Sequence, residues 1–471
     1  MMATSAKDAA LGLGTRGAEA TRRWPEWVYW LKHLLGLDRA IAYTALARGV
    51  QILGSTGTVL LILRFLTPVE QGYYYTLLSL VSLQTVFELG FSFVIQQMAA
   101  HECVHLTLHT DGRVEGDPVA HARLASILQK TSRWYLAATV ALCVLVLTVG
   151  GYLFSRHTQA GAPVAWHGPW AVAVLATALL FFLNPFFSFL EGCGQVWQVG
   201  RMRFGQALLG AVMSWGALLA NHGLYSPGMV NVGYATAGLV FLYSRRNLCL
   251  SLLRLPARER AVSWRNDVWP FQWRIGVSSV CALLAVQIFA PVLFLYRGPA
   301  EAGQFGMSLS ITTYLSTLVL AWMSTKATPF GQMIARSEFR RAKALFFRTL
   351  LQALSLLAAM AVACEMAVIA LRYLVPRLAV RIVSPQVFAL LLVACVGGFI
   401  VQSMAVYLRS FKREPFLVRS VVVAVSTVAL ASLAAKTLGI GGVALSYFVC
   451  TGVIGLTYGV VVFRRSYAHY V

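Results

Sequence analysis

Apolar residues occur in twelve long stretches along the chain, and polar residues gather in the shorter segments between them. A membrane-spanning helix needs about 20 apolar residues, and backbone groups surrounded by lipid must form their hydrogen bonds within their own segment. Each stretch is therefore predicted to be a transmembrane helix. The candidate spans lie near residues 45–66, 72–100, 132–154, 168–190, 204–224, 229–250, 271–295, 304–325, 346–371, 386–408, 416–435 and 441–463.

The composition agrees with a protein that has the bilayer as its solvent. Hydrophobic residues make up 58% of the 471 residues and charged residues only 12%, whereas soluble domains contain about 25% charged residues. We expect an all-α polytopic membrane protein whose helices form two six-helix lobes. The expected parts are a cytoplasmic tail with an interfacial helix over 1–43, an N-lobe over 44–254 and a C-lobe over 255–471.

Positive charge predicts the orientation of the spans. One alternating set of connecting segments carries 32 of the 39 Lys and Arg residues, and cytoplasmic segments of membrane proteins carry such an excess. Both termini are therefore expected in the cytoplasm. The formal net charge of +22 suits the anionic lipids of the inner leaflet, and no motif supports a nucleic acid as the partner.

One short turn occurs once in each half of the chain. The motif P-x-E-x-G stands between two apolar helices at Pro68, Glu70 and Gly72, and again at Pro299, Glu301 and Gly303. The helix before each turn opens with an arginine, Arg48 or Arg274. Because each half has an even number of spans, both halves enter the membrane in the same direction, and a pseudo-two-fold axis along the membrane normal is expected. Such repeats predict a central binding site.

Arginines also mark the first span. Arg48 and Arg64 stand 16 residues apart, which is about 24 Å along a helix and places them on nearly opposite faces. Arg64 is close enough to the outer surface for its side chain to reach the head groups. Arg48 can do the same at the inner surface, or it can line a cavity together with Arg274.

A carboxylate is expected inside the second span. Placing a charge such as Glu88 at mid-helix costs about 2.5–3.5 kcal/mol on insertion scales, so it should face a cation, a polar cavity or water. An ion pair with a structural arginine is the other interpretation. Gln84 shares its helical stripe, and Gln287 is a polar position in the seventh span.

The inner end of the fourth span has its own polar group. Asn184 and Pro185 are expected to kink the helix, and Glu191 with Arg201 and Arg203 is expected to form a polar hinge at the inner face. Both a lining of an inner gate and simple helix capping fit these residues.

The second span ends in a match to a zinc-protease motif. His101, Glu102 and His105 form H-E-x-x-H, in which two histidines bind zinc and the glutamate acts as a base. Asn184-Pro185 and Leu190-Glu191-Gly192 are also similar to elements of intramembrane site-2 metalloproteases, although Glu replaces Asp in the second element. The motif falls where the chain leaves its span, so a polar inner loop is the competing interpretation.

Longer runs carry a family resemblance. They are L-T-P-V-E-Q-G-Y-Y-Y-T, F-E-L-G-F-S-F-V-I, E-G-C-G at 191–194, P-F-Q-W-R-I-G, G-P-A-E-A-G-Q-F-G-M-S and A-W-M-S-T-K. Together they resemble the oligosaccharide-flippase (polysaccharide biosynthesis, O-antigen flippase-like) branch of the multidrug/oligosaccharidyl-lipid/polysaccharide (MOP) exporter superfamily. The likeness covers the first eight spans, and the signature of the major facilitators is absent after the second span.

The resemblance implies how the protein works. It implies alternating access through a cationic central cavity, with a polyprenyl-diphosphate-linked oligosaccharide moved from the inner to the outer leaflet. The positions that would receive the diphosphate are Arg48, Arg64, Arg274, Arg297 and Lys326. Glu88 departs from a purely cationic lining, so it is expected either to be structural or to serve a coupling proton or cation.

These observations favour a non-enzymatic flippase in the bacterial cytoplasmic (inner) membrane, without a cofactor. The expected partners are the lipid-linked glycan, membrane lipids and other membrane proteins of polysaccharide assembly. Two alternatives remain: an exporter of drugs or other small solutes, and a membrane enzyme such as a metalloprotease that uses His101, Glu102 and His105.

Overall fold

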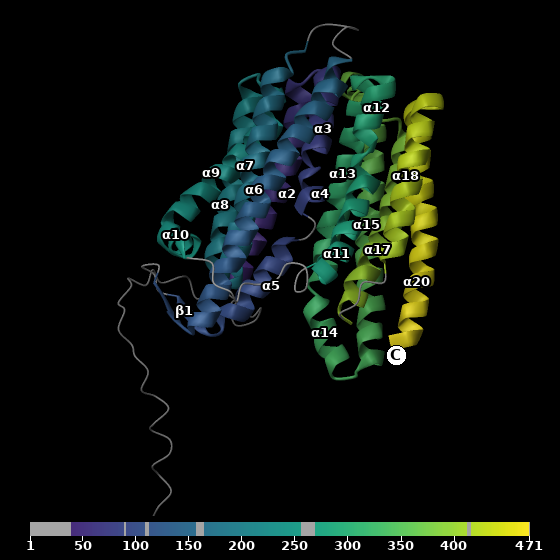
Figure 1. Ribbon diagram of the computed structural model, residues 1–471. Helices are drawn as coiled ribbons and strands as arrows, with labels where there is room; N and C mark the ends of the chain where they lie inside the picture. The colour runs from purple at the N-terminus through teal and green to yellow at the C-terminus, as the bar shows by residue number, and fades with distance from the viewer. Residues whose placement is uncertain are drawn as a thin grey trace, which may run out of the picture.

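The chain folds almost entirely into helices in the computed structural model, which describes residues 39–88, 91–108, 113–156, 164–255, 269–411 and 416–470 (Figure 1). The elements before residue 256 are α2 (Arg39–Phe65), α3 (Pro68–Val81), α4 (Gln84–Glu88), α5 (Phe91–Cys103), β1 (Leu106–Leu108), β2 (Val114–Gly116), α6 (Pro118–Ser155), α7 (His167–Gly192), α8 (Val196–Leu219), η1 (Gly223–Tyr225), α9 (Ser226–Ser244) and α10 (Arg246–Arg254). The strands β1 and β2 pair as an antiparallel hairpin.

The second half repeats the pattern of long helices. Its elements are α11 (Trp269–Gln287), α12 (Phe289–Arg297), α13 (Pro299–Ser324), α14 (Ala327–Ala335), α15 (Phe339–Leu374), α16 (Pro376–Ala379), α17 (Pro385–Arg409), α18 (Leu417–Thr437), α19 (Gly439–Tyr447), η3 (Phe448–Ile454, a π-helical turn) and α20 (Gly455–Tyr470). The expected interfacial helix falls largely within residues 1–38, which lie outside the described residues.

Twelve crossings can be traced through these elements. Eight described helices are long and apolar enough to cross a membrane, or nine when the bent pair α11 and α12 is counted as one span. The remaining crossings are the broken series α3–α5 and the helices α8 and α9. The sequence of α8 contains Arg201 and Arg203, and α9 is 19 residues long and contains Asn231, so polar residues lower the hydropathy of both.

The two halves form two lobes, α2–α10 and α11–α20, which stand side by side (Figure 1). Within the first lobe α8 packs against α2 and α9, and α7 packs against α5, α6 and α9. Within the second lobe α17 packs against α13, α15 and α20, while α18 packs against α11. The main contact between lobes is that of α3 with α13, the two helices that follow the repeated turns.

The outside of the bundle is apolar, as lipid requires. Leu53, Val240 and Leu351 are 72%, 67% and 71% exposed, although each lies within a membrane-spanning helix. In water such exposure would be costly, but against acyl chains an apolar side chain is at no disadvantage. The exposed faces therefore mark the lipid-facing perimeter of the protein.

The repeated P-x-E-x-G turn is the beginning of a helix in both lobes. Before α3, the hydroxyl of Thr67 accepts a hydrogen bond from the backbone N–H of Glu70 at 3.2 Å, and the carboxylate of Glu70 accepts one from the N–H of Thr67 at 2.8 Å. This is a capping box, and the proline occupies the first helical position, where no N–H is needed. In the second lobe Gly298, with φ of 94°, takes the cap position instead.

The second crossing is broken, although the sequence predicts one continuous helix over 72–100. The helix α3 ends at Val81, and the chain continues through the separate helices α4 and α5. At the first break the hydroxyl of Ser82 donates to the carbonyl oxygen of Ser79 at 2.6 Å. A serine side chain that bonds the backbone in this way competes with the regular helical ladder. The prediction missed this break because Ser82 and Leu83 interrupt neither the apolar character of segment 72–100 nor the helical spacing of its apolar residues.

Candidate functional site

A cavity of about 350 Å³ lies between the two lobes. Four elements bound it on their facing sides: α3 with its continuation into α4, α9, α11–α12 and α13. Its lining contains no charged side chain among the described residues. The lining residues are Tyr75, Leu78, Ser79, Val81, Ser82, Gln84, Pro227, Val230, Asn231, Val286, Gln287, Ala290, Gly306, Leu309, Ser310, Thr313 and Tyr314.

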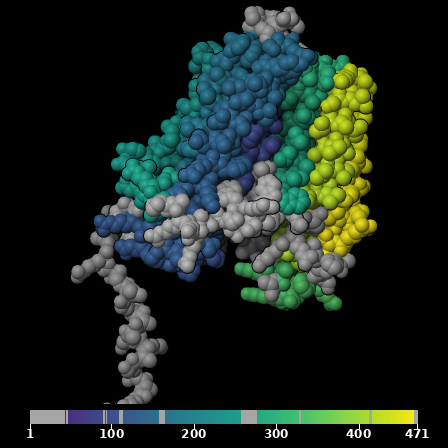
Figure 2. All heavy atoms as spheres, viewed as in Figure 1, coloured from purple at the N-terminus to yellow at the C-terminus, as the bar shows by residue number. Residues whose placement is uncertain are grey.

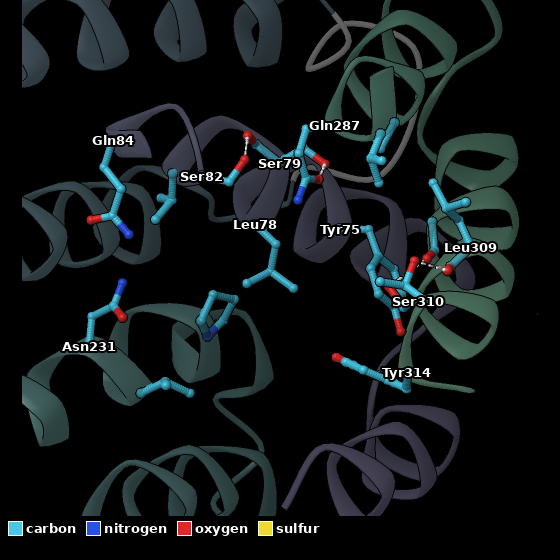
Figure 3. Close-up of a pocket in the computed structure, with 17 residues that line it drawn as sticks. Tyr75, Leu78, Ser79, Ser82, Gln84, Asn231, Gln287, Leu309, Ser310 and Tyr314 are labelled. Atoms are coloured by element: carbon cyan, nitrogen blue, oxygen red, sulfur yellow. Dashed lines mark hydrogen bonds between the residues drawn. The ribbon is translucent and has the colours of Figure 1, made fainter. Parts of the chain in front are cut away.

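Amide and hydroxyl groups converge on the middle of this cavity (Figure 3). The amide groups of Gln84 and Asn231 point toward one another from opposite sides, and the hydroxyl of Tyr314 points into the space between the lobes. The hydroxyl of Tyr75 and the Oε1 atom of Gln84 are buried without a hydrogen-bond partner in the described part of the chain. Unpaired buried polar atoms are rare in folded proteins, because each costs about 1–3 kcal/mol.

The cavity lies beside the breaks of two crossings. The hydroxyl of Ser79, just before the break in the second crossing, donates to Oε1 of Gln287 at 3.3 Å. Gln287 is the last residue of α11, where the seventh crossing bends by 41° into α12. This hydrogen bond joins the lobes at the level of the cavity, and it brings together two positions that are 208 residues apart in the chain.

The two repeated turns meet and close the outer side of the cavity. A Cβ atom on Gly72 would collide with the carbonyl group of Pro299, and one on Gly303 would lie 2.7 Å from the backbone nitrogen of Gly72. Only glycines allow this approach of backbone to backbone. The buried side chain of Gln71 adds hydrogen bonds from Nε2 to the carbonyl oxygens of Gly303 and Arg381, each at 2.9 Å.

An arginine and an aromatic cluster extend this outer seal. The guanidinium of Arg381 donates to the carbonyl oxygen of Ile62 at 3.2 Å, which ties the second lobe to the end of α2. Burial lowers the pKa of Arg381, and the nearby carboxylate of Glu70 acts in the opposite direction. The ring of Phe294 packs edge-on against Tyr73 and Phe154, with centroids 4.9 and 5.4 Å apart. The lobes are thus joined by polar and aromatic contacts at their outer ends.

The inner ends of the lobes are less closely joined. The short helix α5 ends the second crossing in the first lobe, and α14 follows α13 in the second lobe. Their atoms end apart at the lower edge of the face drawn in Figure 2. Figure 1 marks the C-terminus at this lower edge. The bias of Lys and Arg assigns both termini to the cytoplasmic side, so the lower edge is taken as the inner side.

The cations expected to line the central cavity lie at other levels of the bundle. Arg64 is exposed at the outer end of α2, with its guanidinium 5.7 Å from the centre of the Phe65 ring. Arg297 donates to the carbonyl oxygens of Ala435 and Lys436 at 2.8 and 3.3 Å. It therefore satisfies backbone groups at the end of α18, which a helix terminus leaves unpaired. The expected cationic lining is absent from the described part of this cavity.

Positive charge is found instead on the inner portions of two helices that meet between the lobes. Arg48 is exposed in the inner half of α2, and Lys326 is half-buried directly after the inner end of α13. The helices α2 and α13 contact each other across the interface. Arg274 belongs to the inner half of α11, but its side chain lies outside the described residues. A role of these cations in binding stays a prediction.

Glu88 lies near the cavity in sequence but is not part of its lining. It is the last residue of α4 and half-buried, and its Oε1 atom accepts a hydrogen bond from the hydroxyl of Ser92 at 2.6 Å. No ion pair joins it to an arginine whose side chain the structure describes. A structural role and a coupling role for Glu88 both stay predictions.

At the inner end of the fourth crossing, one of the two arginines expected beside Glu191 pairs with it. Glu191 forms an ion pair with Arg203 at 3.1 Å, and Arg201 is exposed. One residue of α8 separates the two arginines, so they point in different directions. Asn184 is half-buried and Pro185 is buried within α7, which continues to Gly192. Their role in an inner gate stays a prediction.

The H-E-x-x-H match does not form a metal site. The helix α5 ends at Cys103, so His105 no longer follows the helical spacing that would bring it beside His101, and both histidines are exposed. Glu102 is buried and pairs with Nε of Arg123 at 3.0 Å. The described residues contain no group of three or more His, Cys, Asp or Glu able to hold a metal ion. This removes the basis of the metalloprotease alternative.

Sequence reasoning found part of the cavity lining. Gln84 and Gln287 stood out as polar positions in apolar spans, whereas Tyr75, Asn231 and Tyr314 did not. A usable signal exists for one side, because Tyr75, Ser79 and Ser82 follow helical spacing on one face of α3. No signal in the sequence alone places Asn231 of α9 opposite Gln84.

The chain thus forms two lobes of six crossings, with a polar cavity between them that is sealed on one side. The chain matches no protein-family profile and no curated protein. Among solved structures, its fold is similar to that of the lipid II flippase MurJ in an inward closed conformation, with a TM-score of 0.61 and 12% identity over 91% of this chain and 90% of the other.

Two further solved structures share the fold. One is an inward-facing multidrug resistance MATE family transporter of the MOP superfamily, with a TM-score of 0.54 and 15% identity over 87% of this chain and 98% of the other. The other is a MOP superfamily transporter from Pyrococcus furiosus, with a TM-score of 0.53 and 13% identity over 91% and 95%. The chain therefore has the MOP transporter fold, and these neighbours are transporters rather than enzymes.

Proposed function

We propose that this protein is a flippase that moves a polyprenyl-diphosphate-linked oligosaccharide from the inner to the outer leaflet for assembly of a surface polysaccharide. One observation carries the proposal: a polar cavity without carboxylates lies between two lobes whose outer ends are sealed. In this state the protein is arranged to accept a substrate from the inner side. The bacterial cytoplasmic membrane is the proposed location, and other membrane proteins of polysaccharide assembly are proposed partners.

The distribution of charge supports an anionic, lipid-attached substrate. A diphosphate that leaves water needs fixed cations to replace its hydration. Arg48 and Arg274 belong to the inner portions of α2 and α11, and Lys326 follows the inner end of α13. The prenyl chain can remain in the lipid beside the lobes. An inside-negative membrane potential would favour outward movement by about 2.3 kcal/mol per charge per 100 mV.

Reopening on the other side requires the outer seal to separate. The interlobe contacts of Gln71, Gly72 and Arg381 would then be exchanged for contacts at the inner ends of the lobes. Each hydrogen bond of the seal contributes only about 0.5–1.5 kcal/mol, so a rigid-body movement of the lobes can exchange these contacts for others.

An exporter of lipophilic cations is the alternative that the likeness to the MATE transporter raises. The described lining gives it little support, since a cationic drug in a dehydrated cavity needs a nearby carboxylate. Export of ethidium from vesicles by the purified protein, in the absence of any movement of lipid-linked glycan, would favour this alternative.

The proposal is tested with full-length protein in vesicles that contain a fluorescent polyprenyl-diphosphate-linked disaccharide. Wild-type protein is expected to move the label between leaflets, and Arg48→Glu or Arg274→Glu is expected to abolish movement without loss of membrane insertion. Arg64→Gln is the matched control, because Arg64 is at the outer surface, and it should have a mild effect. Normal transport by the Arg274→Glu protein would contradict the assigned role of that cation.

A further inference from the structure

The cavity between the lobes has the wrong chemistry for a diphosphate. All 17 of its lining residues are uncharged. A diphosphate carries at least two negative charges, and an uncompensated charge away from bulk water is strongly unfavourable. Among the cations whose side chains are described, Arg48 and Lys326 lie toward the inner side and Arg64 and Arg297 toward the outer side. The anionic part of the substrate is therefore not accommodated in the cavity itself.

The polar groups of the cavity match a neutral ligand that both donates and accepts hydrogen bonds. Tyr75 is only 4% exposed, and its hydroxyl has no partner in the described part of the chain. Oε1 of Gln84 is likewise unpaired. Asn231 uses its Nδ2 atom to donate to the hydroxyl of Thr177 at 2.8 Å. Figure 3 draws this nitrogen on the side of Gln84 and the carbonyl oxygen of Asn231 on the other side. Hydroxyl and acetamido groups of a sugar supply both donors and acceptors.

Other hydroxyls in the same cavity are already satisfied. Ser310 donates to the carbonyl oxygen of Gly306 at 2.8 Å, and Thr313 donates to that of Leu309 at 2.7 Å. Both hydroxyl protons are therefore already used in hydrogen bonds within α13. The contrast separates two lining groups that have no partner in the described part of the chain, the hydroxyl of Tyr75 and Oε1 of Gln84, from hydroxyls that are already bonded, those of Ser310 and Thr313.

We propose that the cavity is a subsite for the first sugar of the lipid-linked glycan, held by Tyr75, Gln84 and Asn231, while the diphosphate remains on the inner side near Arg48 and Lys326. This inference rests on the proposed flippase function. A volume of about 350 Å³ is at the small end of ligand pockets, so the subsite takes a small part of the glycan rather than the whole repeat unit. Recognition then depends on the sugar next to the diphosphate.

The test compares two lipids that differ only in the sugar. Full-length protein in detergent is titrated with polyprenyl-diphosphate-N-acetylglucosamine and with bare polyprenyl diphosphate, and binding is followed by tryptophan fluorescence. Wild-type protein is expected to bind the sugar-bearing lipid about tenfold more tightly, as one or two additional neutral hydrogen bonds predict. Tyr75→Phe and Gln84→Leu should reduce the preference to about threefold or less.

Two controls make the result specific. Ser310→Ala removes a cavity hydroxyl that is already bonded, so the preference for the sugar-bearing lipid should be retained. Arg48→Gln should weaken binding of both lipids by the same factor, because both carry the diphosphate.

The possible outcomes separate the two proposals. Equal binding of both lipids by wild-type protein, or an equal loss for both lipids in Tyr75→Phe and Gln84→Leu, would overturn the sugar subsite and leave the flippase function standing. Failure of the wild-type protein to bind either lipid would overturn the flippase function and the subsite together.

Discussion

Among single residues, the two glycines of the repeated turns set how closely the lobes approach at the outer side. The backbone of Gly72 lies against Pro299, and Gly303 lies against Gly72. Any side chain there must hold the lobes apart, since backbone cannot move aside as a flexible side chain can. The motif that marks the repeat in the sequence is thus also the contact that seals the cavity.

Replacing Gly72 by leucine is expected to open the outer seal. With Ser82→Cys as a reporter in the cavity, a membrane-impermeant maleimide added from outside should label the Gly72→Leu protein several times faster than its parent. Gly151→Leu is the matched control, because a Cβ at Gly151 in α6 meets nothing within 4 Å. Equal labelling rates in Gly72→Leu and its parent would show that the turns do not form the seal.

A second residue-scale prediction concerns the ion pair of Glu102 and Arg123. Arg123→Ala leaves a buried carboxylate without its partner and should lower the stability of the protein by about 1–3 kcal/mol. The measurement is the Tm of the purified protein in detergent.

The wild-type protein should be insensitive to metal. EDTA and added zinc should leave its Tm unchanged, and the double variant His101→Ala/His105→Ala should transport normally. Stabilisation by zinc that disappears in this double variant would instead restore a metal site at the motif.

At the level of elements, the breaks in the second and seventh crossings face the same cavity. A continuous helix presents its backbone groups only to itself, whereas the ends of α3, α4, α11 and α12 place polar residues such as Ser82 and Gln287 between the lobes. Broken membrane helices are tolerated where they line a cavity. The breaks therefore place the polar lining inside a bundle whose exterior is apolar.

Removal of the Gln71 side-chain amide should favour separation of α3 from α13. Gln71→Leu loses two hydrogen bonds between the lobes, together about 1–3 kcal/mol. The ratio of outer-closed to outer-open protein should therefore fall by about tenfold. Spin labels at His101→Cys in α5 and Gln332→Cys in α14 report the inner opening, and their separation should shorten.

A matched variant is available in the second lobe. Gln304 donates to the carbonyl oxygen of Val380 at 2.7 Å, in the same loop but within one lobe, so Gln304→Leu should leave the label distances unchanged. An identical distance distribution in Gln71→Leu and wild-type protein would contradict a clamping role for Gln71.

Much of the fold could be predicted from the sequence, because twelve apolar stretches and the bias of Lys and Arg report directly on the membrane. The sequence groups Glu191 with Arg201 and Arg203 but does not say which arginine pairs with it. The pairing of Glu102 with Arg123 could not be predicted, because packing between elements brings the two residues together. The neutral cavity could not be predicted either, because helix packing brings its residues together. Gln84 and Asn231 are far apart in the chain, and only the arrangement of α4 and α9 makes them face each other.

At the level of the whole molecule, polarity is arranged in layers along the membrane normal. Arg48 and Lys326 lie toward the inner side, the neutral cavity lies between the lobes, and the glycine seal with Arg381 and Gln71 closes the outer side. Such an order suits a substrate with an anionic group between a neutral glycan and an apolar tail. It gives the flippase proposal a physical basis beyond the likeness in fold.

The central claim is tested most directly by the location of lipid-linked glycan in cells that lack this protein and any redundant flippase. The measurement is the fraction of diphosphate-linked repeat units in each leaflet, together with the amount of surface polysaccharide. We predict that repeat units accumulate in the cytoplasmic leaflet, that surface polysaccharide is lost, and that Glu102→Gln restores both while Arg48→Glu does not. Repeat units that still reach the outer leaflet in such cells would contradict the flippase function.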